Sequence, residues 1–549
     1  MEPQVTRPGE DRNGGIADPT GRFDRRRLLV IAAQGAAVSA AGGLLAACGS
    51  SSSSTTAGTA TEAAKKGGAM TVGMIGNGTS ETLSPLTGLV PVDFMRSTAL
   101  FDNLWVISPD VSSVIPRLVE SIDPSPDAKT WTIHLRKGVE WHDGSPLTAD
   151  DLVWTFKAWG QPSSVAMGSI IDIVDFKRVR KVGPMSVEVP LQLSVGEFPS
   201  LVSVPGFGVI KNGSTPSELA RNPIGTGPYK YKSFTPGQQS VFEVNDNYWS
   251  QGPSIDSLVV QSSFSDDTAL TNSLLSGAVQ VIPNVSFVEA KQQENASGVK
   301  VLRSQSPNAY YFSMRVDKPP FDDARVRQAM RLIADRPALV AGALNGYGQI
   351  GNDLMGEDAK YFASDLQRAQ DIGEAESLLR SASQEGLKVS LETSSVSPGM
   401  LEAGTLLAEQ AKQAGVTIEV QNVDPANYYT DAGGWLTRVF GQNKNGVAYP
   451  SLTSAYLTQL WTGAPYNDGR WGDAPGESDD PLFKAIATLD PDKAQEAWNV
   501  VQDQHFEEGP YIVWGNADFV DLVALDVRGL KTTAAGPLNN YDFSRAGLA

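Results

Sequence analysis

The chain has 549 residues, with 44 Lys and Arg against 62 Asp and Glu, three His and a single Cys. A net charge of −18 argues against nucleic-acid binding, which needs a basic patch, and one cysteine excludes both an internal disulfide and a cysteine-rich zinc site. Hydrophobic residues make up 41% of the chain, which is enough to bury a sizeable core in about three or four packing units.

The N-terminal region has the pattern of an export signal. Three arginines at 25–27 precede an uncharged stretch at 28–47, and this arginine run resembles the twin-arginine signal of bacterial export. Cys48 follows Leu-Ala-Ala, as in the bacterial lipobox, so we predict that residues 1–47 are a signal peptide and that Cys48 becomes lipidated. The alternative is a membrane helix at 28–47, which is long enough to span a bilayer.

Residues 48–68 are predicted to be the lipidated N-terminus and a flexible linker. The stretch 49–68 is rich in Ser, Thr, Gly and Ala and has no large apolar residue, so it cannot form a core. A linker of this composition reaches about 25 Å, and two acyl chains suffice for durable anchoring. We therefore expect a cell-membrane lipoprotein whose body lies on the extracytoplasmic face.

Strand and helix patterns begin directly after this linker. Residues 70–75 predict a first strand, and alternating apolar residues around Ile133 predict another. Thr148 with Asp151 three residues later is close to a capping box, so we expect a helix to begin there. Its core face would carry Leu152, Val153, Phe156 and Trp159.

The second half of the chain continues the alternation of strands and helices. Ser265 is predicted to cap a helix that Gly277 ends. Apolar spacing at 326–333 predicts a further helix, and the next one is expected to start behind Asp335. Together with strands predicted at 241–244, 258–260, 279–281 and 416–420, these patterns indicate a mixed α/β fold without a fixed-period repeat.

Motifs for catalysis or metal binding are missing from the sequence. It has no Gly-x-Ser-x-Gly, no P-loop and no His-Glu-x-x-His, and the histidines His134, His142 and His505 are too scattered for a local metal cluster. Acidic pairs at 266–267 and 322–323 stand at predicted helix starts, where the helix dipole explains them. We expect no catalytic residue, no metal and no cofactor, although distant carboxylates of a surface hydrolase could still converge in the fold.

Six motifs are spread along the chain at 131–144, 146–154, 223–231, 247–249, 255–256, and 321–330 with 335–336. Together they resemble the family 5 extracytoplasmic solute-binding proteins of bacterial ABC importers, a family with oligopeptide, dipeptide and nickel binders. They occur in the family's order through about four-fifths of the mature chain, and we interpret them as scaffold rather than ligand contacts. Gly225 and Gly227 suit a tight turn, and Arg325 and Arg327 are expected to pair with surface acids.

The resemblance implies a two-lobed α/β fold of the periplasmic-binding-protein type (class II, family 5). Lobe I would comprise 69–313, with a subdomain inserted at about 101–220, and the tail 515–549 would return to it. Lobe II would be 314–514, and the lobes would be joined by a hinge of crossing strands. A monomeric receptor of this kind would close around a small-molecule or peptide solute and deliver it to the ABC permease subunits.

The family's cleft also suggests where the solute would be contacted. Aromatic and amide side chains give a large contact area with few directional bonds, which suits a permissive pocket. The candidates are a loop after the first strand, two tyrosines of the crossing region and a set in lobe II. They are Thr79, Ser80 and Glu81; Tyr310 and Tyr311; and Trp435, Gln442, Asn443, Asn445, Tyr449, Trp461 and Tyr466.

One departure from the family's pattern bears on the solute. Peptide-binding members commonly carry an acid in a Trp-x-x-Asp-Tyr-x-Asp-Pro type of stretch, which pairs with the ammonium group of the peptide. The matching residues 440–451 contain no acid, so a buried peptide N-terminus would lack its ion partner. A peptide-like solute remains the first expectation, while an oligosaccharide, a chelated metal, a signalling role and a hydrolase stay open.

Overall fold

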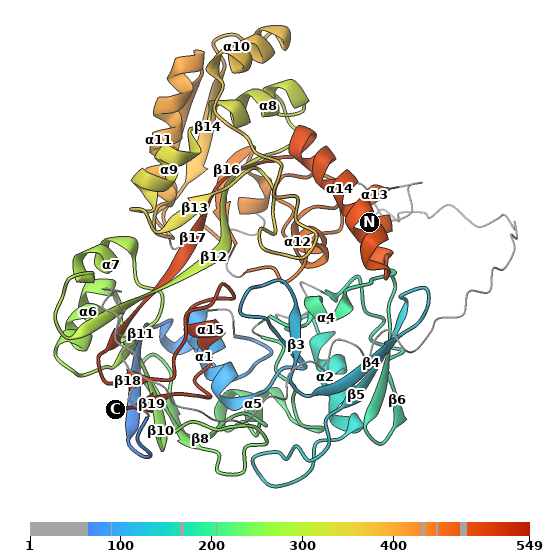
Figure 1. Cartoon of the computed structure of the whole chain (residues 1–549), viewed down its shortest axis with the longest axis vertical. Helices are drawn as coiled ribbons and strands as arrows, with labels where there is room; N and C mark the ends of the chain where they lie inside the picture. Colours follow the sequence, from blue (N-terminus) through green and yellow to red (C-terminus); the bar gives the residue numbers. More distant parts are fainter. Residues whose placement is uncertain are drawn as a thin grey trace, which may run out of the picture. The chain divides into compact units, whose positions relative to one another are not determined.

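Two long antiparallel strands cross the middle of the molecule and connect the two halves of its main sheet (Figure 1). They are β12 (Val299–Met314) and β17 (Tyr511–Ala524), which pair from Val299 opposite Ala524 to Ser313 opposite Tyr511. The structure is a computed structural model that describes residues 64–88, 90–164, 170–204, 206–425, 427–429, 434–445, 448–472 and 480–549. The predicted signal peptide, Cys48 and most of the predicted linker lie outside these residues.

The main sheet mixes parallel and antiparallel pairs. On one side of β12 and β17, β14 runs parallel to β15 and to β16, and on the other side β1 runs parallel to β10 and β11. Parallel neighbours require crossover connections, which the helices between these strands supply. The sheet order is β15 (Thr417–Asn422), β14 (Lys388–Thr393), β16 (Phe440–Lys444), β12, β17, β11 (Val281–Ile282), β1 (Ala69–Ile75), β10 (Ser257–Phe264), β9 (Gln239–Val244) and β8 (Tyr229–Thr235), with β13 (Gly348–Ile350) on β17.

Smaller sheets lie beside it. A four-stranded antiparallel sheet is built from residues between Val119 and Pro190, and its strand β5 (Thr130–Leu135) shows the predicted alternation, with Trp131, Ile133 and Leu135 buried. Its other strands are β4 (Val119–Pro124), β7 (Ser186–Pro190) and β6 (Arg180–Gly183). Two short pairs are β2 (Trp105–Ile107) with β3 (Val114–Pro116), and β18 (Val527–Arg528) with β19 (Gly547–Leu548).

The helices largely follow the predicted apolar faces and caps. In α2 (Ala149–Trp159) the Asp151 carboxylate accepts hydrogen bonds from the Thr148 backbone and hydroxyl, so the predicted capping box is present. The others are α1 (Pro91–Leu100), α4 (Phe198–Leu201), α5 (Pro216–Arg221), α6 (Asp267–Leu275), α7 (Phe287–Gln293), α8 (Ala324–Ile333), α9 (Arg336–Ala343), α10 (Ile372–Ser381), α11 (Met400–Ala411), α12 (Leu452–Gln459), α13 (Pro481–Ala487), α14 (Pro491–Glu508) and α15 (Leu538–Tyr541).

Three local predictions need correction. The cap of α6 is Asp266 rather than Ser265, because the Asp266 side chain accepts the Ala269 amide at 2.8 Å. The strand expected to resume at Val279 is shorter, since β11 begins only at Val281. Arg327 is buried, and it donates to the carbonyl oxygens of Phe321 and Glu508 instead of pairing with a surface acid.

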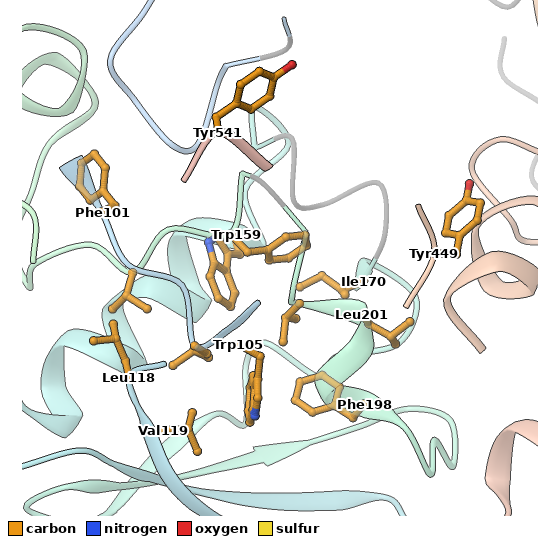
Figure 2. Close-up of a cluster of buried hydrophobic side chains, with 14 of the residues drawn as sticks. Phe101, Trp105, Leu118, Val119, Trp159, Ile170, Phe198, Leu201, Tyr449 and Tyr541 are labelled. Atoms are coloured by element: carbon orange, nitrogen blue, oxygen red, sulfur yellow. The ribbon is translucent and has the colours of Figure 1, made fainter. Parts of the chain in front are cut away.

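The buried apolar side chains form two large clusters. One lies around β5, α2 and α12, and the other around α8, α9 and α11. Figure 2 shows Trp105, Phe198 and Leu201 in the first cluster, together with Tyr449 from a distant segment of the chain. Residues near 200 and near 450 are therefore brought together by packing, which positions the cavity described below.

Asp151 offers a direct test of this packing. Its other oxygen accepts the Asn212 amide at 2.8 Å, so Asp151→Ala should leave buried donors unpaired and lower the free energy of unfolding by about 1 to 3 kcal/mol. Urea unfolding measures this change. The matched control is Asp150→Ala, which removes only an exposed ion pair with Lys181 and should cost less than about 1 kcal/mol. Equal losses in both variants would contradict this role of Asp151.

Candidate ligand-binding site

A cavity of about 340 Å³ lies at the end of β16, where segments distant in sequence meet. A volume of this size suits a small solute. Tyr311 comes from β12, Asn443 and Lys444 from β16, and a polar face from α12. The lining residues are Leu201, Val204, Tyr311, Tyr429, Trp435, Asn443, Lys444, Asn445, Tyr449, Ser454, Thr458, Gln459 and Tyr466.

Three aromatic rings form one side of the cavity, which we call the aromatic wall (Tyr429, Trp435 and Tyr466). The Trp435 and Tyr466 rings are stacked with centroids 6.0 Å apart, and Tyr429 meets Trp435 edge-on at 6.0 Å. Tyr429 and Tyr466 are 39% and 42% exposed, although large apolar side chains usually avoid water. Exposed rings on a cavity can be covered by a bound solute.

Amide and hydroxyl groups provide the polar part of the lining. The Tyr429 hydroxyl donates to Asn443 Oδ1 at 2.9 Å, and Gln459 Nε2 donates to Asn445 Oδ1 at 2.8 Å. Gln459 Oε1 is buried and accepts no hydrogen bond from the part of the chain that the structure describes. A buried acceptor without a partner is costly, so a donor from a bound solute would be favourable here.

Behind Asn443 lies a buried carboxyl group. Asp468 accepts a hydrogen bond from the Tyr511 hydroxyl at 2.8 Å and one from Asn443 Nδ2 at 3.4 Å. Burial raises the pKa of Asp468 to about 6, and these hydrogen bonds only partly offset it. Asp468 does not line the cavity itself, so it acts on a solute only through Asn443.

The structure brings together half of the residues that the sequence suggested for solute contact. Two of the other suggested residues, Tyr310 and Gln442, lie outside the cavity lining. Strand geometry explains this, because neighbouring residues of a strand face opposite sides. Tyr310 packs against Trp514 with ring centroids 5.7 Å apart, and Gln442 accepts the Thr393 hydroxyl at 2.6 Å. Those that line the cavity are Tyr311, Trp435, Asn443, Asn445, Tyr449 and Tyr466.

The remaining suggested residues have other surroundings. Trp461 is buried against Phe483, and its indole nitrogen donates to the Leu457 carbonyl at 2.8 Å. Thr79 and Ser80 are exposed in a short 3₁₀ turn (Gly78–Ser80). Glu81, by contrast, is fully buried and forms an ion pair with Arg96 at 2.9 Å.

Glu81 is held by a dense set of donors. Its carboxylate accepts the backbone amides of Asn77 and Gly237 at 2.8 and 3.0 Å, besides the Ser262 hydroxyl at 2.8 Å. Burial acts to raise the pKa of Glu81, but these hydrogen bonds and the charge of Arg96 outweigh it, so the pKa is lowered. A carboxylate with so many partners ties the loop after β1 to the β8–β9 turn.

Sequence reasoning missed seven lining residues. Two signals could have identified three of them. Ser454 and Thr458 are four residues apart on α12, a spacing that places them on one helix face, and Tyr429 follows another tyrosine in the sequence. Lys444 lies between Asn443 and Asn445, which the sequence did suggest. Leu201, Val204 and Gln459 carry no comparable pattern, because only tertiary packing brings them to the cavity.

A contact beside the cavity joins α4 to the start of α12. The Thr453 hydroxyl donates to the Glu197 carboxylate at 2.9 Å, and the hydroxyls of Ser200 and Ser451 lie 2.7 Å apart. Burial raises the pKa of Glu197, and the hydrogen bond from Thr453 partly opposes that rise. These side chains come from segments about 250 residues apart, so the contact depends on the tertiary arrangement.

The described residues contain neither a cluster of metal ligands nor a membrane-spanning helix. Within them, no group of three or more His, Cys, Asp or Glu could hold a metal ion. No helix in the same part of the chain is long and apolar enough to cross a membrane. The uncharged stretch at 28–47 lies outside the described residues.

Comparison with known proteins agrees with this architecture. The model for bacterial extracellular solute-binding proteins, family 5 Middle, matches residues 113–467. The dipeptide-binding protein of Escherichia coli K12 is 24% identical over 490 residues, which cover 82% of this chain and 89% of the relative.

Solved structures share the fold. The periplasmic binding protein DppA of Helicobacter pylori, in complex with the peptide STSA, has a TM-score of 0.73 at 18% identity and covers 88% of this chain and 98% of its own. The binding protein AgaA of A. tumefaciens R10, in complex with agropinic acid, has a TM-score of 0.73 at 20% identity and covers 88% and 99%.

The chain therefore belongs to family 5 of the bacterial extracellular solute-binding proteins. It has the mixed α/β periplasmic-binding-protein fold and is the solute-binding component of an ABC importer on the extracytoplasmic side. Members of this family are binding receptors rather than enzymes, so the resemblance, the fold class and the expectation of no enzymatic activity are confirmed.

The buried Asp468 predicts a specific dependence of stability on pH. Its folded-state pKa of about 6 lies above the ordinary 3.8, so the folded state holds the proton more tightly and loses stability as pH rises between these values. When the pH is raised from 4 to 8, the unsubstituted chain should therefore lose about 2 to 3 kcal/mol more of its free energy of unfolding than the Asp468→Asn variant does.

Urea unfolding at both pH values measures that difference. The control is Asp365→Asn, which changes an exposed carboxylate and should leave the pH profile of the chain as it was. If the Asp468→Asn profile runs parallel to that of the unsubstituted chain, the burial of a raised-pKa carboxyl is refuted.

Proposed function

We propose that the chain captures a peptide-like solute in the cavity at the end of β16, closes around it and delivers it to the permease subunits of its importer. The observation that carries this proposal is the lining itself, which combines the aromatic wall with amide side chains from β16 and α12. The names of the relatives support it, since one binds dipeptides and another was solved with the peptide STSA.

We further propose that closure is a hinge motion between two lobes, residues 69–313 with 515–549 and residues 314–514, with a subdomain inserted at about 101–220. Leu201 and Val204 reach the cavity from the first of these lobes, while Tyr449 and its neighbours reach it from the second. The pairing of β12 with β17 supplies a continuous connection around which the lobes could turn. A solute that contacts both lobes only when they are closed would shift the population toward that state.

In this proposal, the contact between α4 and α12 stabilises the closed arrangement. Glu197 and Ser200 belong to the first lobe, whereas Ser451 and Thr453 belong to the second. Each hydrogen bond of this kind contributes about 1 kcal/mol net, which is small enough for opening to remain reversible.

We also propose that Cys48 is lipidated after removal of residues 1–47, which would anchor a monomeric receptor to the membrane through its linker. The support is the sequence alone, with the arginine run at 25–27 and the small residues before the only cysteine. The twin-arginine resemblance predicts export in the folded state.

A thermal-shift screen tests the proposed function. The purified chain is heated with dipeptides, oligosaccharides and nickel–histidine chelates, and a captured solute should raise Tm by mass action. Trp435→Ala should abolish the shift given by the best compound, because it removes the centre of the aromatic wall. The matched control is Trp154→Ala, a partly exposed tryptophan on α2 away from the cavity, which should keep the shift.

The outcomes separate the candidate functions. A rise in Tm with dipeptides supports a peptide-like solute. A rise with saccharides alone, or with chelates alone, would mean that the solute belongs to that class instead. The capture proposal fails if no class shifts Tm, or if Trp154→Ala and Trp435→Ala lose the shift equally.

A further inference from the structure

A second contact links the two proposed lobes at Gly196, two residues before α4. The Gly196 backbone amide donates to the carbonyl oxygen of Ile486 at 2.7 Å. Ile486 lies in the last turn of α13, where carbonyl oxygens have no partner within the helix. The bond therefore satisfies a backbone acceptor that α13 itself leaves unpaired.

The contact at Gly196 is continuous with the one between α4 and α12. Glu197, the next residue, accepts the Thr453 hydroxyl at 2.9 Å, and the hydroxyls of Ser200 and Ser451 lie 2.7 Å apart. These two hydrogen bonds join side chains, which can rotate to follow a change in separation. The bond of Gly196 joins two backbones, so it fixes how closely the two segments approach.

The approach at Gly196 leaves no room for a side chain. A Cβ atom added to Gly196 would lie 2.5 Å from the carbonyl oxygen of Thr488, which follows α13. Ordinary contacts of a Cβ atom begin at 3.4 Å, so the two backbones would have to separate by about 1 Å. Gly196 is not among the glycines with a left-handed backbone, so the close approach rather than the conformation requires glycine here.

The segment that leads into α4 is fixed to the first lobe. The Val195 amide donates to the Ala128 carbonyl oxygen at 3.1 Å, and the ring of Phe198 lies 6.0 Å from that of Trp131 on β5. The last residue of α4, Leu201, lines the cavity. A separation of this segment from α13 would therefore also move one side of the cavity away from the other.

From these contacts we infer that Gly196 is a positioning residue for solute capture. Its lack of a side chain lets the first lobe approach α13 closely enough to bring Leu201 and Val204 onto the cavity. A side chain at this position would stop closure short. Gly196 does not line the cavity, so it acts through α4 rather than on the solute. The inference rests on the proposed function and adds to it the contact that limits closure.

Spin-label distances in the chain without solute test the inference. Labels are placed at Lys157→Cys on α2 and Glu376→Cys on α10, in the full chain with Cys48→Ser. Gly196→Ala should lower the fraction of molecules at the shorter separation by about tenfold, because it overpacks the closed arrangement alone. The matched control is Gly252→Ala, whose Cβ atom would meet nothing within 4 Å, and it should leave the distribution unchanged.

Solute capture gives a second readout with the same pair of variants. The dipeptides, oligosaccharides and nickel–histidine chelates of the thermal-shift screen are added to each variant. Any compound that raises Tm of the unsubstituted chain should raise it less in Gly196→Ala and equally in Gly252→Ala, because a chain that closes less binds more weakly. Circular dichroism establishes that each variant is folded before it is measured.

Three results would overturn the inference: an unchanged distance distribution in Gly196→Ala, an equal change in Gly252→Ala, or a Gly196→Ala chain that does not fold. The last result counts because opening the lobes should relieve the close contact and leave each lobe intact. If no compound raises Tm of the unsubstituted chain, solute capture fails, while the distances without solute still decide the role of Gly196. If compounds raise Tm but the distances are unchanged, capture stands and only this role is refuted.

Discussion

The pairing of β12 with β17 is the interaction on which the rest of the structure depends. It joins the β14–β16 side of the main sheet to the side that contains β1 and β8–β11 (Figure 1). Almost every residue of β17 is buried, so the pair is covered on both faces along most of its length. On its other edge, β12 pairs with β16 and places Tyr311 opposite Asn443, so β12 forms part of the cavity as well as of the connection.

Buried ion pairs stabilise the loops and helices around these two strands. The ion pair of Glu81 with Arg96 and that of Arg336 with Asp353 are buried and rich in partners, so they fix loops and helices in place. In the cavity, the buried Gln459 Oε1 has no hydrogen-bond partner among the described residues. A donor of a bound solute would satisfy this acceptor, which fits the role of a solute receptor.

The sequence predicted much of the fold because local signals and tertiary packing agree. The alternation in β5, the capping box of α2 and the apolar face of α8 all correspond to buried or capped residues in the structure. It predicted less about caps and charged side chains. Asp266 and Ser265 are both good caps, and nothing local indicated that backbone carbonyl oxygens would engage Arg327 in the interior.

The cavity was predictable only in part, because local sequence signals do not specify tertiary contacts. Aromatic and amide residues near 311 and 435–466 pointed to a region, but the side that each one faces depends on strand register. Tyr310 and Tyr311 are adjacent, yet only the second lines the cavity. Leu201 and Val204 lie more than two hundred residues before Trp435, and only the fold brings them to the cavity.

Spin-label distances between the two proposed lobes show whether the chain closes around a solute. In the full chain with Cys48→Ser, labels at Lys157→Cys on α2 and Glu376→Cys on α10 report the separation of exposed sites on either side of the β12–β17 pair. The account predicts a broad or double distance distribution without solute, and a shift to the shorter separation when a compound that raises Tm is added. A single distance that the compound leaves unchanged would contradict it.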